Sequence, residues 1–154
     1  MDEPIPPKGN IAHLHLFLDD DHSGKKVTRI SHTGTLIFLD LAPIMWYSTQ
    51  QNRIQILLCG SKFVAIKIST GIIKGLSYNI WIFHIHMDDT TNLFCDNQHL
   101  CNNFQMTDST LKKNHFTIYY HIVREICASG VMRVSWESGN TKLADVLTKL
   151  ISEC

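Results

Sequence analysis

The stretch Leu16-Phe17-Leu18-Asp19-Asp20-Asp21-His22-Ser23-Gly24 places three consecutive carboxylates directly after an apolar run. Within residues 11–18, His13 and His15 alternate with Leu14 and Leu16, which is typical of a β-strand, so we expect Asp19 at the end of a strand. Clustered carboxylates at such a point suit a hard cation, because cations such as Mg²⁺ prefer oxygen ligands. The alternative is a solvated turn, since Asp and Gly are ordinary turn residues.

Two further acidic residues stand at comparable positions downstream. Asp96 follows the apolar run at residues 91–95, and Asp145 lies near the start of a short amphipathic segment. Three separated acidic points that converge in space would form one metal site, and we therefore expect Asp19, Asp96 and Asp145 to meet.

Length and charge limit the possible classes. The 154 residues suit one domain, in which residues 1–10, with three prolines, are a linker and residues 11–154 fold. Lysine and arginine number 14, as do aspartate and glutamate, so the net charge is zero. This balance is unusual for a free-standing nucleic-acid binder.

Cysteine usage and hydropathy indicate an intracellular protein. The five cysteines are odd in number and show no C-x-x-C pair, which suits reduced thiols better than a disulfide framework. No apolar run reaches the ~18 residues of a membrane span, and we expect no membrane partner.

The hydrophobic pattern predicts an α/β fold. The predicted strands are 11–18, 35–39, 44–48, 91–95 and 131–136, and the predicted helices are 61–83, 97–104, 116–129 and 142–151. This order predicts a mixed five-stranded sheet with helices on both faces. Crossover connections return the chain in parallel, so the first and fourth strands should be neighbours, with Asp19 beside Asp96. Gly71 and Gly75 permit a break in the longest helix.

Seven short segments stand in a recognisable order. They are residues 19–24 (DDDHSG), 31–34 (SHTG), 42–48 (APIMWYS), 60–65 (GSKFVA), 94–97 (FCDN), 109–113 (STLKK) with Tyr120, His121, Arg124 and Glu125, and 143–149 (LADVLTK). In this order the chain resembles the ribonuclease H domain of the Pol polyprotein of Ty1/copia-type LTR retrotransposons. Each segment alone is weak evidence for this family, but the seven segments in order are specific to it, and the resemblance covers residues 11–152.

The resemblance implies an RNase H-like fold and hydrolysis of the RNA strand of an RNA–DNA hybrid. In this chemistry two Mg²⁺ ions about 4 Å apart activate a water and stabilise the leaving oxygen; Mn²⁺ is the alternative metal. By position, Asp19, Asp96 and Asp145 match the metal-binding carboxylates. The implied partner is the reverse transcriptase domain of the same polyprotein, and the implied location is the cytoplasm, with the nucleus as the alternative.

One position departs from the family pattern. Lys62 stands where family members usually have a catalytic glutamate, which removes a metal ligand and places an ammonium group at the metal site. We therefore expect an RNase H domain with impaired activity, or one that depends on Mn²⁺ or a single ion. The alternative is that Lys62 extends into solvent on its flexible stem and leaves a three-Asp site.

Two other features favour a decayed or truncated element copy. The apolar run at residues 54–58 replaces polar residues of the family, and the chain opens on Met1 without a polymerase domain ahead of it. A non-catalytic RNase H-fold module, or a remnant without a role, is thus the alternative function.

Contacts to nucleic acid rest mainly on the resemblance. The candidate phosphate contacts are Lys25, Lys26, Arg29, Lys112 and Lys113, and the candidate contacts to sugar hydroxyls are Asn97 and Gln98. Charged loops are solvated by default, so this role competes with simple solvation. A further alternative is a transition-metal site at the H-x-H pairs His13 with His15 and His84 with His86.

Overall fold

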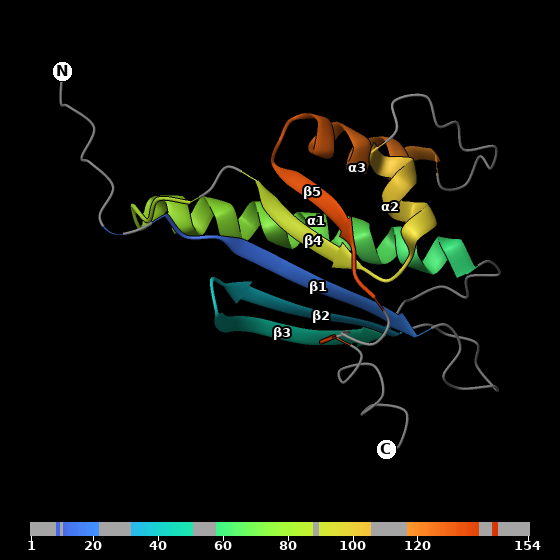
Figure 1. Ribbon diagram of the computed structural model, residues 1–154, viewed down its shortest axis with the longest axis horizontal. Coiled ribbons are helices and arrows are strands. Elements are labelled where there is room, and N and C mark those ends of the chain that lie inside the picture. Colours follow the sequence, from blue (N-terminus) through green and yellow to red (C-terminus); the bar gives the residue numbers. More distant parts are fainter. Residues whose placement is uncertain are drawn as a thin grey trace, which may run out of the picture.

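The computed structural model describes residues 9, 11–21, 32–50, 58–87, 90–105, 117–138 and 143–144. These residues form a five-stranded sheet in the order β3-β2-β1-β4-β5 with three helices (Figure 1). The strands are β1 (Leu14–Asp21), β2 (His32–Leu39), β3 (Ala42–Gln50), β4 (Thr91–Cys95) and β5 (Met132–Trp136). The helices are α1 (Leu58–Ile82), α2 (Gln98–Gln105) and α3 (Thr117–Ala128).

The sheet is mixed, as the element order predicts. β1, β2 and β3 are antiparallel neighbours, whereas β1–β4 and β4–β5 are parallel. The β2–β3 turn at Asp40 and Leu41 is tied to the start of β1, because the Asp40 carboxylate accepts a hydrogen bond from the His13 backbone N–H at 2.9 Å. Asp40 has φ of 54°, a left-handed conformation that Asp tolerates better than most residues.

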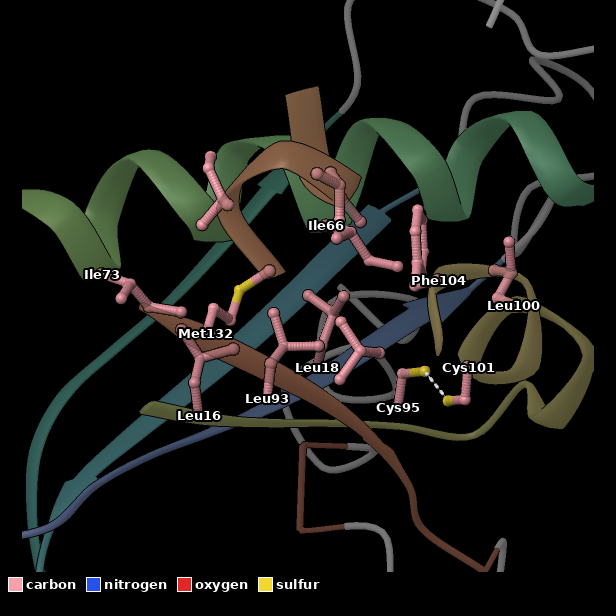
Figure 2. Close-up of a cluster of buried hydrophobic side chains, with 14 of the residues drawn as sticks. Leu16, Leu18, Ile66, Ile73, Leu93, Cys95, Leu100, Cys101, Phe104 and Met132 are labelled. Atoms are coloured by element: carbon pink, nitrogen blue, oxygen red, sulfur yellow. Dashed lines mark hydrogen bonds between the residues drawn. The ribbon is translucent and has the colours of Figure 1, made fainter. Parts of the chain in front are cut away.

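One face of the sheet packs on the three helices. Alternate side chains of β1, namely Leu14, Leu16 and Leu18, are buried in one cluster with residues of α1, α2, α3, β4 and β5. Ile66 and Ile73 of α1 lie over the strands in this cluster (Figure 2). At roughly 25 cal/mol per Å² of apolar surface, this burial is the main stabilising contribution to the fold.

The opposite face of the sheet has an aromatic cluster. The rings of Phe17 and Phe94 stack at 5.0 Å between centroids, and Phe38 meets Phe17 edge-on at 5.7 Å. Leu143 joins these rings around an open cavity of about 330 Å³. Apart from residues 143 and 144, the helix predicted at 142–151 lies outside the described residues, so a helix on this face stays a prediction.

Two predicted elements need correction at their ends. The strand predicted at residues 11–18 is β1, which begins at Leu14 and continues to Asp21, because its pairing with β2 extends to Asp21 opposite His32. The helix predicted at 61–83 is α1, which begins three residues earlier and runs without a break through Gly71 and Gly75. A Cβ at either glycine would meet nothing within 4 Å, so neither marks a close approach.

The other predicted strands and the helices predicted at 97–104 and 116–129 are confirmed, and β4 has the predicted bounds. The linker expected at residues 1–10 lies outside the described residues except for Gly9. Among the helices that the structure describes, none combines the length and apolarity needed to cross a bilayer.

The core makes a simple prediction about stability. Leu93 of β4 is 0% exposed and Leu41 in the β2–β3 turn is 94% exposed. Leu93→Ala should lower the free energy of unfolding by about 2–5 kcal/mol, because it removes buried methylenes and leaves a cavity. Leu41→Ala should change it by less than about 0.5 kcal/mol. Urea unfolding followed by circular dichroism measures both, and equal effects would contradict this assignment of the core.

Candidate functional site

The candidate site is built on the parallel pair β1 and β4. The register pairs Leu18 with Cys95, so the next residues along the two strands are Asp19 and Asp96. Neighbouring strands lie about 4.8 Å apart, and this places the two aspartates at the same edge of the sheet, as the sequence predicts. Asp19 is 5% exposed. It lies within β1 rather than at the end of this strand, because the pairing of β1 with β2 continues to Asp21.

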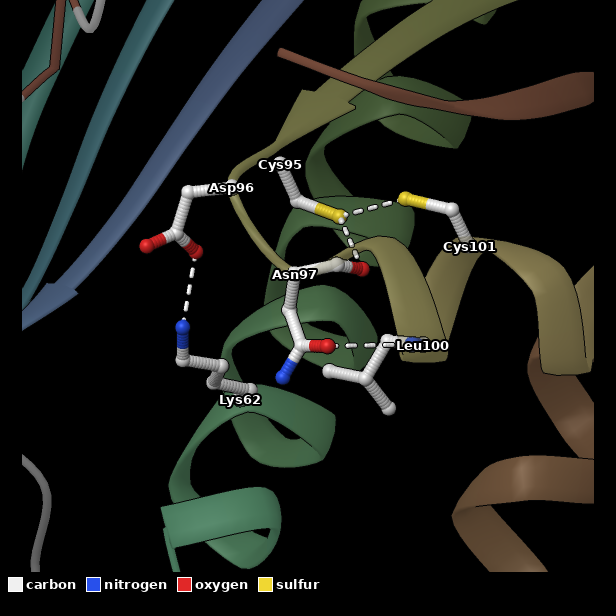
Figure 3. A network of polar contacts seen from close by, with 6 residues as sticks. All are labelled: Lys62, Cys95, Asp96, Asn97, Leu100 and Cys101. Carbon is white, nitrogen blue, oxygen red and sulfur yellow. Dashed lines mark hydrogen bonds and ion pairs between the residues drawn. The ribbon is translucent and has the colours of Figure 1, made fainter. Parts of the chain in front are cut away.

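Lys62 of α1 reaches this edge and binds Asp96. Its Nζ lies 2.7 Å from Oδ1 of Asp96, and the two side chains are only 16% and 20% exposed (Figure 3). The alternative of a lysine that extends into solvent is therefore wrong for this structure. A partly buried ion pair of this length is a charge-assisted hydrogen bond, which is stronger than a neutral one.

The next residue fixes the position of Lys62. Phe63 is 2% exposed and its ring packs edge-on against Phe104 of α2 and Tyr120 of α3, at 5.6 and 6.2 Å between centroids. Phe104 and Tyr120 also stack on each other at 5.7 Å. This cluster joins the three helices and holds the first turns of α1 against the sheet, so the stem of Lys62 starts from a rigid point.

A lysine is electrostatically unfavourable one turn into a helix. The N-terminal end of a helix carries a partial positive charge, which favours acidic side chains there. α1 has no acidic residue in its first turn. The Asp96 carboxylate compensates for this, since it supplies the negative charge from the neighbouring strand.

The described residues fit a divalent metal poorly at Asp96. The acidic pair Asp19 and Asp96 supplies the right kind of oxygen, but the Lys62 ammonium already binds one of the Asp96 oxygens. Two unit charges 4 Å apart repel by about 4 kcal/mol at an effective dielectric of about 20, and a dication doubles this. Within the described ranges no three His, Cys, Asp or Glu side chains gather as a metal site. The third carboxylate, Asp145, lies outside the described residues.

The connection from β4 to α2 contains two predicted contact residues. Asn97 precedes α2, and its Oδ1 accepts a hydrogen bond from the Leu100 N–H at 3.2 Å, so Asn97 caps the helix. Gln98 begins α2 and is exposed. Sequence reasoning missed the capping role, although an Asn just before a helical segment is an N-cap signal.

Cys95, which ends β4, lies 3.0 Å from Cys101 of α2 between sulfur atoms. The hydrogen bond that the two thiols share lowers the pKa of Cys95 and raises that of Cys101. No sequence pattern pairs these two residues, and the apolar run before Asp96 predicts only that Cys95 is a small buried residue.

The remaining predicted residues are the basic residues of two predicted loops and four histidines. The basic residues Lys25, Lys26, Arg29, Lys112 and Lys113 lie outside the described residues. Among the described residues, no group of three His, Cys, Asp or Glu side chains includes His13, His15, His84 or His86, so the transition-metal alternative stays a prediction. His13 and His15 instead lie with their rings 6.4 Å apart and nearly parallel.

Sequence comparison finds relatives among retrotransposon proteins, although no family model matches the chain. The chain is 29% identical over 148 residues to the retrovirus-related Pol polyprotein from transposon RE1 of Arabidopsis thaliana, and 28% identical to that from transposon RE2. The match covers 94% of this chain but only 10% of each relative. The chain therefore spans about a tenth of the length of these polyproteins.

Solved structures share the fold. RNase H1 from Halobacterium salinarum superposes with a TM-score of 0.68 at 10% identity, covering 92% of this chain and 99% of that one. LC11-RNase H1 in complex with an RNA/DNA hybrid superposes with a TM-score of 0.62 at 12% identity, covering 89% and 94%. The five-stranded sheet and its helices are thus an RNase H fold.

The Lys62–Asp96 pair can be measured by a double-mutant cycle. Lys62→Met removes the ammonium group that binds the partly buried Asp96 carboxylate and should destabilise the protein by about 1–3 kcal/mol. With Asp96→Asn the two changes should show a coupling energy of about 1 kcal/mol, because each variant removes the same contact. Urea unfolding of the four proteins at pH 7 gives this value, and additivity within about 0.3 kcal/mol would contradict the ion pair.

Proposed function

We propose that this chain, an RNase H-like domain similar to part of the Pol polyprotein of retrotransposons, binds RNA–DNA hybrid and is impaired in hydrolysing its RNA strand. The observation behind the impairment is the 2.7 Å ion pair of Lys62 with Asp96. A lysine that is held at this carboxylate competes with any cation there. The glutamate that the family resemblance implies at position 62 would instead add a carboxylate to the site.

Support for hybrid binding comes from the fold and its relatives. LC11-RNase H1, which has the same fold, is solved in complex with an RNA/DNA hybrid. In this chain the corresponding site would be the edge where Asp19 and Asp96 meet. Gln98 is exposed beside it, and Asn97 has an amide nitrogen beyond its capping oxygen. We propose that these two side chains contact sugar hydroxyls, which distinguish RNA from DNA.

The net charge of zero suggests a partner for binding. Phosphate contacts by Lys and Arg supply most of the non-specific affinity for nucleic acid. In this chain Lys and Arg do not outnumber Asp and Glu. We propose that a reverse transcriptase domain of the same polyprotein holds the hybrid while this domain contacts it. The cytoplasm is the proposed location, with the nucleus as the alternative.

The second candidate function is active hydrolysis by Asp19, Asp96 and Asp145 with Mg²⁺ or Mn²⁺. The register that places Asp19 beside Asp96 favours it. The two candidates differ in one respect, which is whether Lys62 blocks the reaction, and a single substitution distinguishes them.

Cleavage of a labelled RNA–DNA hybrid tests the impairment directly. We expect the unaltered protein to show little or no cleavage in Mg²⁺ or Mn²⁺. Lys62→Glu should raise the rate at least about tenfold, equivalent to about 1.4 kcal/mol off the barrier, because it removes the competing ammonium and adds a carboxylate. The rate is measured by gel separation of the labelled RNA products.

Two control variants complete the experiment. Lys74→Glu makes the same charge change on an exposed part of α1 and should not restore cleavage. Asp96→Asn combined with Lys62→Glu should remove the restored activity. Cleavage by the unaltered protein that Asp96→Asn abolishes would refute the impairment, and silence of every variant would favour a purely non-catalytic module.

Hybrid binding has its own test. Replacement of Lys112 and Lys113 by glutamine should weaken binding and reduce the slope of log K against log salt by about 1 for each phosphate that is no longer neutralised. Lys74→Gln is the matched control and should leave the slope unchanged. Fluorescence anisotropy with a labelled hybrid at several salt concentrations measures this, and an unchanged slope in the double variant would exclude these lysines as phosphate-binding residues.

A further inference from the structure

Two cysteines lie close together beside the candidate site. Cys95 is the last residue of β4 and Cys101 lies in α2, six positions later in sequence. Their sulfur atoms are 3.0 Å apart, and the two side chains point toward each other (Figures 2 and 3). Both are free thiols in this structure.

The surroundings hold the two thiols in this arrangement. Cys95 is 4% exposed and Cys101 2% exposed, and both belong to the main hydrophobic cluster. A disulfide has an S–S distance of about 2.05 Å, so the two sulfurs need to approach by only about 1 Å.

We propose that Cys95 and Cys101 form a reversible disulfide when the protein reacts with a small peroxide, and that this bond reduces local opening of the segment containing Asp96 and Asn97. One of the two sulfurs attacks an oxygen of hydrogen peroxide, which breaks the O–O bond and gives a sulfenic acid and water. The other sulfur attacks the sulfenic sulfur, the S–S bond forms, the S–O bond breaks, and the hydroxide leaves as water with the thiol proton. Two thiols and one peroxide thus give one disulfide and two waters, and an external dithiol reverses the oxidation.

Access to the buried pair depends on α2. This helix has eight residues, and helices of this length are marginal without tertiary contacts. Local opening of such an element is easier than global unfolding, and hydrogen peroxide is small and uncharged. Bulkier oxidants should therefore react more slowly.

The disulfide would act on the connection that holds the candidate site. Asp96 and Asn97 lie between the two cysteines in sequence, and the N–H of Cys101 donates to the Asn97 carbonyl at 3.1 Å. With the Leu100 N–H bonded to Asn97 Oδ1, these contacts form the first turn of α2. A covalent link across this turn should reduce its local opening.

Peptide mapping tests the bond itself and does not depend on the proposed function. The reduced full-length protein is treated with hydrogen peroxide, denatured, alkylated and cleaved with chymotrypsin. Cleavage after Phe94, Leu100 and Phe104 separates the two cysteines into peptides 95–100 and 101–104. We expect these peptides to be joined, two hydrogens lighter than their sum, and to separate after treatment with dithiothreitol. Cys127 of α3 should stay alkylated as the internal reference.

Hydrogen exchange tests whether the disulfide reduces local opening of the first turn of α2. Oxidation should slow exchange of the Leu100 and Cys101 amides several-fold in the unaltered protein and in Cys127→Ala. The same treatment should have no such effect in Cys101→Ala, which also cannot give the joined peptides. Alkylated Cys95 and Cys101 after peroxide, or a bond from either to another cysteine, would refute the disulfide. Unchanged exchange of these amides in the oxidised protein would refute the claim that the disulfide reduces local opening of this turn.

Discussion

The parallel pairing of β1 with β4 positions both the hydrophobic core and the candidate site. These strands lie at the centre of the sheet, and the 25-residue α1 lies between them in the chain together with β2 and β3. Their shared face presents Leu16, Leu18 and Leu93 to the helices and forms the core. The same register brings Asp19 and Asp96 to one edge. Stability and the candidate site therefore depend on one set of backbone hydrogen bonds.

The Lys62–Asp96 ion pair shows how this fold holds a cation beside an acidic side chain at the end of β4. A cation at the start of a helix is unfavourable in isolation, but here a neighbouring strand supplies its counter-charge. Phe63, the next residue, belongs to the aromatic cluster that joins the three helices. The core thus positions residue 62 through its neighbour Phe63, and the lysine at this position places a positive charge beside Asp96.

The connection from β4 to α2 concentrates several roles in few residues. Cys95 is buried in the core, Asp96 binds Lys62, and Asn97 caps α2. A change at any of these positions therefore affects its neighbours through the backbone. This proximity is also the reason that a disulfide between Cys95 and Cys101 would affect the candidate site.

Hydrophobic periodicity in the sequence predicted the fold class and the bounds of β4. The order of the elements, with the crossover rule, predicted the mixed sheet and the adjacency of Asp19 and Asp96. The folded structure added that β1 continues to Asp21, since this depends on hydrogen bonds to β2. It also decided that Lys62 binds Asp96, 34 positions away, and that Cys95 meets Cys101. A flexible lysine has many possible partners along a chain, and a cysteine has no periodic signal. Packing and register select one partner for each, and a sequence pattern does not contain that choice.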